Sequence, residues 1–390
     1  MPVDFSKKNV DSKEEEESSS KKRNKKSSEN NSSPMDKINR WLLRFSKVPL
    51  KEKVFFVQNL GLMLRSGISL SIGLKTLANQ TSNKRLAEIL NNVGEEVEKG
   101  NSFGDSLKKH KNVFGDMFIS MVEAGELSGK LEDVLVQLHI QMKKENALIS
   151  KVKGALTYPA VIIFAMLGIG TFMIVFVVPK ITAMFDEMNA ELPLPTKILI
   201  KTSEIVIDNG ILTIILLTVL IFSFFKAIKT EKGKFIFQAF LLKLPIFGPI
   251  MKKINTARFA RNISSLLKTD IMIIKSFQIT ANVLGNLHYR RALLAMAQKI
   301  KKGEKLNETI SQYPNLFTPV VAQMVAIGEE TGELDSILEE LAGFYEEEID
   351  LIMDNLPAII EPVLILALGV GVGGVAIAII MPMYSITSAI

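Results

Sequence analysis

The chain has 390 residues, of which 47% are hydrophobic and 23% are charged, and its formal net charge is +6. This mixture is typical of a membrane protein with large soluble parts, and the length allows two or three domains. The sequence contains no cysteine, which excludes disulfide bonds and thiolate chemistry.

The N-terminal segment, residues 1–40, is rich in Lys, Glu, Ser and Asn and has few large apolar residues. Such a segment buries too little surface to offset its chain entropy, so a disordered charged tail is predicted. The polybasic run KKRNKK at 21–26 would suit anionic lipid or nucleic acid. Because acidic residues dilute it, a solvated tail is the preferred interpretation, and no direct contact with nucleic acid is expected.

Residues 41–154 are predicted to form a first soluble helical domain. Phe56, Leu60, Met63 and Leu64 follow helical spacing, and no segment shows the alternation of a strand. A second helical domain is predicted over residues 227–356.

The chain repeats itself with an offset of 203 residues. AGELSGKL at 124–131 recurs as IGEETGEL at 327–334. The same offset also pairs residues far from this stretch, among them Phe56 with Phe259, Asn59 with Asn262, Gly100 with Gly303 and Pro179 with Pro382. These matches indicate an internal tandem duplication.

The repeated stretch is interpreted as a tight helix–helix turn. Each copy has two glycines and a glutamate, which are Gly125, Gly129 and Glu126 in the first copy and Gly328, Gly332 and Glu329 in the second. The glycines are expected to supply positive φ angles, and the glutamates are expected near helix N-termini. Ser128 and Thr331 are the expected N-caps of the following helices. A docking point for a partner protein is a compatible functional interpretation.

Three apolar segments are long enough to span a bilayer, at 155–179, 205–226 and 357–384. Residues 180–204 are assigned to an external loop, and 385–390 to an external C-terminus. Each copy then leads directly into a span, and the middle span returns the chain, so the two copies are parallel.

Charge places the soluble domains in the cytoplasm. Residues 226–305 contain 17 Lys or Arg against three acids, whereas the loop on the other side is balanced. By the positive-inside rule, the N-terminus is cytoplasmic and the C-terminus is external.

The sequence lacks the motifs of a catalytic or cofactor site. His110, His139 and His288 are scattered without metal-ligand spacing, and GELSGKL at 125–131 lacks the spacing and the Ser/Thr of a phosphate loop. The acids Glu132 and Asp133, with Glu126, would suit a divalent cation, but a solvated helix start is preferred. We therefore expect no enzyme, no cofactor and no metal.

Glu361 lies four residues inside the third span, beside Pro362, and the equivalent pair in the first copy is Tyr158 and Pro159. Carboxylates inside a membrane are costly and tend to be paired. Two interpretations stay open. Glu361 either bonds a polar group at a helix–helix contact, for which Tyr158 is one candidate, or reaches water at the interface.

Several motifs resemble one family in the same order. They are RSGISLSIGLKTLA (65–78), MVEAGELSGKLEDVL (121–135), FVVPKITAMFDEMNAELPLPTKIL (176–199) and LPIFGPIMKKINTARFARNISSLL (244–267). The sequence thus resembles the inner-membrane platform proteins of type II secretion and type IV pilus machines, the GspF/PilC family. One departure is Asp270, where the first copy has Gly67.

This resemblance implies a non-enzymatic scaffold in the cytoplasmic membrane. It would link a cytoplasmic assembly ATPase to prepilin or pilin subunits, contact other inner-membrane assembly proteins and form homo-oligomers. The alternatives are a small transporter or channel, or a membrane receptor. Three spans with almost no polar pathway and a short external loop favour the scaffold. The predicted fold class is an all-α membrane protein with two tandem cytoplasmic helical bundles and three transmembrane helices.

Overall fold

The computed structural model describes residues 47–187 and 193–387, and every regular element in that part of the chain is a helix. The tail predicted over residues 1–40 lies outside the described residues. The chain divides into two compact units, residues 1–102 and 103–390, and each is described by itself.

The described residues of the first unit, 47–102, form three helices, α3 (Leu50–Arg65), α4 (Leu70–Gln80) and α5 (Lys84–Glu98). Each buries an apolar stripe at helical spacing, with Phe56 and Leu60 on α3 and Leu74 on α4 completely or almost completely buried. The side chain of Asn83 accepts a hydrogen bond from the backbone N–H of Leu86 (3.0 Å), which caps α5.

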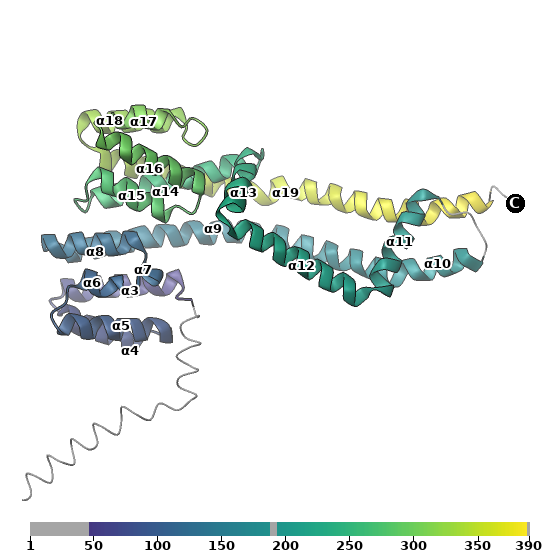
Figure 1. The fold of residues 1–390 in the computed structure, drawn as a ribbon, viewed down its shortest axis with the longest axis horizontal. Helices are drawn as coiled ribbons and strands as arrows, with labels where there is room; N and C mark the ends of the chain where they lie inside the picture. The colour runs from purple at the N-terminus through teal and green to yellow at the C-terminus, as the bar shows by residue number, and fades with distance from the viewer. Residues whose placement is uncertain (1–46, 188–192, 388–390) are drawn as a thin grey trace, which may run out of the picture. The chain divides into compact units, whose positions relative to one another are not determined.

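The second unit starts with three short helices and one long one. In chain order they are α6 (Phe103–Lys108), α7 (Lys111–Phe114), α8 (Asp116–Ser128) and α9 (Leu131–Phe172). A π-helical turn, η1 (Met173–Val177), joins α9 to α10 (Val178–Glu187), and then come α11 (Leu194–Asp208) and α12 (Gly210–Lys229) (Figure 1).

The second copy of the duplication follows α13 (Glu231–Lys243). It comprises α14 (Phe247–Leu267), α15 (Ile273–Val283), α16 (Leu287–Lys301), α17 (Leu306–Ser311), α18 (Pro319–Thr331) and α19 (Leu334–Thr387). Helices α15 to α18 begin and end 203 residues after α4, α5, α6 and α8, respectively. The predicted tandem all-α architecture is therefore confirmed at the level of single helix ends.

An aromatic cluster forms the centre of the second bundle. The ring of Phe259 packs edge-on against Phe277 and Phe317, with centroids 5.7 and 5.0 Å away, and Tyr289 packs against Phe317 at 5.3 Å. The hydroxyl of Tyr289 donates to the carbonyl O of Leu316 (2.6 Å). Burial raises the pKa of the Tyr289 phenol, so it stays a neutral donor.

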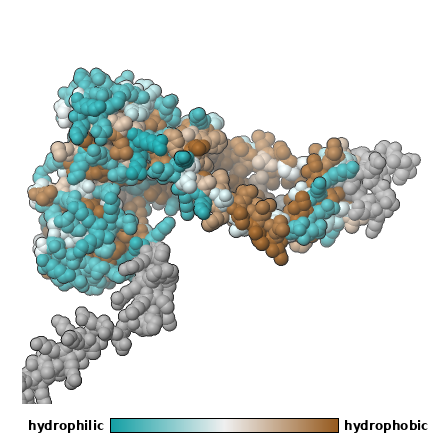
Figure 2. Space-filling model, in the orientation of Figure 1, coloured by the Kyte–Doolittle hydropathy of each residue, from teal (hydrophilic) through white to brown (hydrophobic). Residues whose placement is uncertain are grey.

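In the part of the chain that the structure describes, three helices have the length and composition of membrane spans. They lie within Leu131–Ala183, Gly210–Lys229 and Leu334–Ala378, and their apolar windows are almost entirely unburied. In Figure 2 the surface over α12 is hydrophobic, whereas the bundle of the second copy is mostly hydrophilic. Helices α13 and α14 meet at a bend of 110°, and together they are also long and apolar enough for a membrane span. Because α14 buries Arg261 and Asn262 against the protein, we assign it to the soluble bundle.

The segment assigned to an external loop is helical in its described residues. Helix α10 runs to Glu187, and α11 starts at Leu194. Thr196 donates a hydrogen bond to the carbonyl O of Ala378 on α19 (2.5 Å), and Ser203 donates to that of Ile174 (2.6 Å). These bonds join α11 to α19 and to η1, the turn that follows α9, away from the bundle (Figure 1).

Candidate functional site

The second glycine of each repeated turn ends a helix. Gly129 and Gly332 have φ angles of +70° and +78°, which are left-handed values that favour glycine. After α8, the N–H of Lys130 donates to the carbonyl O of Gly125 (2.8 Å). The expected positive φ is thus found at these two glycines.

The first glycine of each turn has a different role from the expected one. Gly125 and Gly328 are helical, so the predicted positive φ is wrong there. A Cβ on Gly125 would lie 2.7 Å from Cγ2 of Val134, and one on Gly328 would lie 3.0 Å from the Cα of Leu334. Glycine is required because the helix before the turn and the helix after it touch at this point.

The glutamates of the turns cap helices that lie far earlier in the sequence. Glu126 accepts hydrogen bonds from the N–H groups of Phe103 (2.7 Å) and Gly104 (2.9 Å), at the start of α6. Glu329 accepts from Leu306 (3.0 Å) and Asn307 (3.3 Å), at the start of α17. A carboxylate at a helix N-terminus satisfies unpaired N–H groups and complements the helix dipole.

The two predicted N-caps are wrong. Ser128 and Thr331 are the last residues of α8 and α18, and their hydroxyls donate back to the carbonyl groups of Ala124 and Ile327. Lys130 stands at the N-cap position of α9 and makes no side-chain cap. The preference of Ser and Thr for caps is outweighed here by the glycine that follows each of them and ends the helix.

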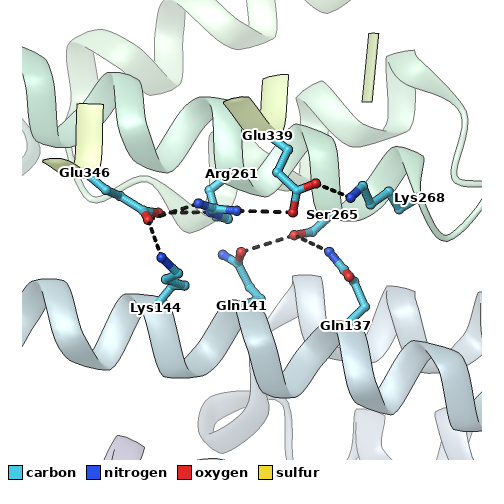
Figure 3. A network of polar contacts seen from close by, with 8 residues as sticks. All are labelled: Gln137, Gln141, Lys144, Arg261, Ser265, Lys268, Glu339 and Glu346. Carbon is cyan, nitrogen blue, oxygen red and sulfur yellow. Dashed lines mark hydrogen bonds and ion pairs between the residues drawn. The ribbon is translucent and has the colours of Figure 1, made fainter. Parts of the chain in front are cut away.

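A polar seam, which no sequence pattern indicated, joins the copies where α9 packs against α14 and α19 (Figure 3). The side chain of Gln141 donates to Asn262 (2.5 Å) and accepts from Ser265 (3.2 Å). Gln137 donates to the hydroxyl of Ser265 (3.2 Å). Each of these buried or half-buried polar groups is therefore satisfied by another, as a packed interior requires.

Ion pairs flank the amides of the seam. Arg261, which is only 8% exposed, holds Glu346 with two parallel hydrogen bonds of 2.9 and 3.0 Å. Lys144 approaches the same carboxylate to 3.2 Å. Arg258, one turn earlier on α14, forms a second bidentate pair with Glu145 on α9. Paired arginine forks fix the relative position of two helices more strictly than single charges do.

The seam is built from residues that differ between the copies. Offset by 203 residues, Arg261 corresponds to Gln58, Ser265 to Leu62 and Gln141 to Phe344. Asn262, which matches Asn59, and Glu145 of the flanking ion pair, which matches Glu348, are the exceptions. Matching identical residues therefore could not reveal most of the seam, whereas a search for positions that are polar in one copy and apolar in the other would have marked Gln141 and Ser265.

Two repeat-equivalent residues face each other near the membrane. Lys151 on α9 contacts Asp354 on α19 at 2.9 Å, and they are 203 residues apart. Lys144 and Glu346, which are 202 apart, meet in nearly the same register. The two long helices thus run parallel at this level.

Tyr158 and Glu361 occupy the corresponding positions seven residues further along, and the structure does not bring them together. Both side chains are exposed, and Glu361 makes no hydrogen bond or ion pair within the described part of the chain. Of the adjacent prolines, Pro159 is buried and Pro362 is exposed. The predicted contact of Glu361 with Tyr158 inside one chain is therefore absent from the arrangement seen here.

Asp270, which stands where the first copy has Gly67, lines a cleft beside the turn of the first copy. Asp270 has φ +59° and is the only non-glycine residue with positive φ in the described ranges, where the first copy has Gly67 at +80°. Its carboxylate lies 3.3 Å from Nζ of Lys130, and Ser128 and Lys268 line the same cleft. Over residues 47–187 and 193–387, no cluster of three or more His, Asp or Glu side chains has the arrangement of a metal site.

The close approach at the turns makes a specific prediction. Gly125→Ala and Gly328→Ala should each lower the melting temperature of the purified protein, because a Cβ collides with the next helix. The expected loss is about 1–3 kcal/mol. Gly343→Ala on α19 is the matched control, since nothing lies within 4 Å of its Cβ position, and it should not lower stability. Equal melting temperatures for all three variants would contradict the packing role.

Comparison with known proteins agrees with this geometry. The sequence profile of the family described as type II secretion system (T2SS), protein F matches residues 56–179 and 259–382, one match for each copy. The type IV pilus assembly protein PilC of Thermus thermophilus is 36% identical over 337 residues, which cover 86% of this chain and 83% of that protein.

Further relatives come from both kinds of machine. The PilC of Myxococcus xanthus is 31% identical over 346 residues, covering 89% of this chain and 83% of that protein. The type II secretion system protein F of Aeromonas hydrophila is 30% identical over 343 residues, covering 88% and 87%, respectively. With its two matched copies, its helical bundle and its apolar spans, the chain belongs to the type II secretion protein F family, which includes the PilC proteins of type IV pili.

Proposed function

We propose that the chain is the membrane platform on which prepilin or pilin subunits are assembled into a filament, and that a cytoplasmic assembly ATPase acts on its soluble part. The names of the relatives, which are pilus assembly and secretion proteins, support this function. Other inner-membrane assembly proteins and further copies of the chain are the additional partners that we infer. We infer no catalytic role for the chain itself.

One observation carries the proposal. Helices α9 and α19 run without a break from the bundle into the predicted membrane region, and the polar seam joins them before they enter it. At 1.5 Å per residue, the 54 residues of α19 form a rod about 80 Å long. A displacement applied to the soluble end of such a rod reaches the membrane end, and the seam makes both rods move together.

The surface of the spans favours a scaffold over a transporter. Helix α12 carries no charge before Lys226, and the hydroxyls of Thr213 and Thr218 donate to backbone carbonyls, so this helix offers a solute no charged pathway. The polar contacts of the long helices lie at the seam, at the Lys151–Asp354 pair that follows it, and beyond the spans, through Thr196 and Ser203 on α11.

The seam gives a functional test. In a strain that lacks the gene, Arg261→Leu should insert into the membrane but restore few surface filaments or little secretion. Removing Arg261 leaves Glu346 short of two hydrogen bonds, at a cost of about 1–3 kcal/mol. Arg258→Leu is the matched control, because its pair with Glu145 is more exposed, and it should restore more activity.

Filament counts and secreted protein, normalised to immunoblots of the membrane fraction, would measure both variants. Full activity of Arg261→Leu would contradict the coupling role of the seam. A deletion strain that assembles filaments normally but fails to take up a solute would instead establish a transporter.

We also propose the cytoplasmic membrane as the location, with the N-terminus inside and the C-terminus outside. The excess of Lys and Arg over residues 226–305 supports this orientation. Reporter fusions after residue 40 and near residue 300 should give cytoplasmic signals, and fusions near 190 and 388 should give external signals. An external signal at 300 would reverse the orientation.

Glu361 is proposed to bond a polar group of another protomer or of a partner span. Its exposed carboxylate in an apolar helix supports this, because a charged side chain at mid-bilayer costs about 2.5–3.5 kcal/mol on insertion scales. Glu361→Ala should leave expression intact but reduce cross-linked oligomers and filaments, and Glu361→Gln should be milder because it keeps hydrogen-bonding capacity. Wild-type behaviour of Glu361→Ala in both assays would show that the carboxylate only reaches the interface.

A further inference from the structure

Helix α13 lies at the junction between the middle span and the second bundle (Figure 1). Only Thr230 separates it from the end of α12, and the hydroxyl of Thr230 accepts a hydrogen bond from the N–H of Gly233 (3.1 Å), which caps α13. The ring of Phe237 packs edge-on against Phe224 near the end of α12, with centroids 6.4 Å apart. The helix is therefore held next to the end of the span.

One face of α13 is fixed to the bundle. Gln238 donates to the carbonyl O of Gly285 (3.2 Å) and accepts from the N–H of Leu287 (2.8 Å) at the start of α16. The rings of Phe235 and His288 stack with their centroids 4.0 Å apart. The guanidinium of Arg291 lies 4.3 Å from the centroid of the Phe235 ring. These contacts determine which side of the helix faces outward.

The outward side is apolar and uncovered. Ile236 and Phe240, one turn apart, are 69% and 60% exposed, and Phe247 at the start of α14 is 40% exposed. Large apolar side chains in a row on a soluble surface indicate a contact with another apolar phase. The residues 203 positions earlier, 28–40, read SENNSSPMDKINR and are polar, so this apolar row belongs to the second copy alone.

Basic side chains lie at both ends of this apolar row. Lys226 and Lys229 end α12, and on α13 Lys232 lies one turn before Ile236 and Lys243 one turn after Phe240, against the single acid Glu231. Lys234 lies one turn before Gln238, on the side of α13 that contacts the bundle. Within the described ranges, no ion pair engages any of these five lysines. An apolar row with lysines beside it is the pattern of a helix that lies in the surface of an anionic bilayer.

We propose that α13 is an interfacial helix, in which Ile236 and Phe240 insert into the acyl boundary and the lysines contact anionic phospholipid headgroups. The occupant follows from continuity, because the adjoining span α12 has no buried residue and already requires a bilayer at its end. The apolar face of such a helix enters the bilayer to a depth of about 5–10 Å. Through Gln238 and Phe235, α13 then sets the height and tilt of the second bundle above the membrane. This role is independent of filament assembly.

A tryptophan placed on α13 tests the insertion. The chain has a single tryptophan, Trp41, so Trp41→Phe gives a silent background. The full chain with Phe240→Trp would be reconstituted in vesicles of phosphatidylcholine and phosphatidylglycerol that carry bromine on the acyl chains. We expect blue-shifted emission that the brominated lipids quench, most strongly for bromines close to the headgroups. Met272→Trp, at a 76% exposed position between α14 and α15, is the matched control and should stay unquenched.

The outcomes show whether lipid, protein or water covers the apolar face of α13. Blue-shifted emission without quenching would mean that a second copy or another protein covers the face, and emission like that of Met272→Trp would mean that water does; each overturns the proposal. Ile236→Trp repeats the measurement if Phe240→Trp fails to fold.

The role of charge has a separate readout. Combined Lys232→Gln and Lys243→Gln should reduce the quenching in vesicles with phosphatidylglycerol and not in pure phosphatidylcholine. Equal quenching before and after this change in both lipids would overturn the headgroup contact.

Discussion

The pair between Arg261 and Glu346 is the interaction on which the arrangement of the second unit depends. A guanidinium that is nearly excluded from water is tolerated only where its donors are matched, and the two bonds to Glu346 provide that match. Buried ion pairs add little stability compared with apolar packing, but they strongly disfavour any arrangement that leaves a charge unpaired. With the Gln141–Asn262 bond beside it, the pair permits one register of α9 against α14 and α19.

Much of the fold could be predicted, because the duplication and the apolar spans are both visible in continuous stretches of sequence. The spans appear as uncharged segments, and the turn glycines recur at a constant offset. The positive φ of Gly129 and Gly332 followed from the known preference of helix ends. The role of Gly125 did not follow, because a close approach between two helices depends on packing that a single segment does not reveal.

The contacts of the candidate site were less predictable because they join residues far apart in the sequence. Glu126 caps a helix that starts 23 residues earlier, and Arg261 pairs with Glu346, which lies 85 residues later. No local pattern marks such pairs. Alignment of the two copies marks identical residues, whereas most residues of the seam lie at positions where the copies differ. Backbone conformation is kept between the copies, as Gly100 and Gly303 show with φ of 91° and 90°, while the contact surfaces differ.

The contact between Lys151 and Asp354 has a consequence for how such a chain can arise. Equivalent positions that face each other between parallel helices lie on a local two-fold axis. In a homodimer of a single-copy ancestor, the same residue would stand on both sides of that axis, and a charged residue would meet its own like charge. Fusion of two gene copies removes this restriction, because each half can then mutate alone. Opposite charges at this position are therefore available to the fused chain and not to a homodimer of identical copies.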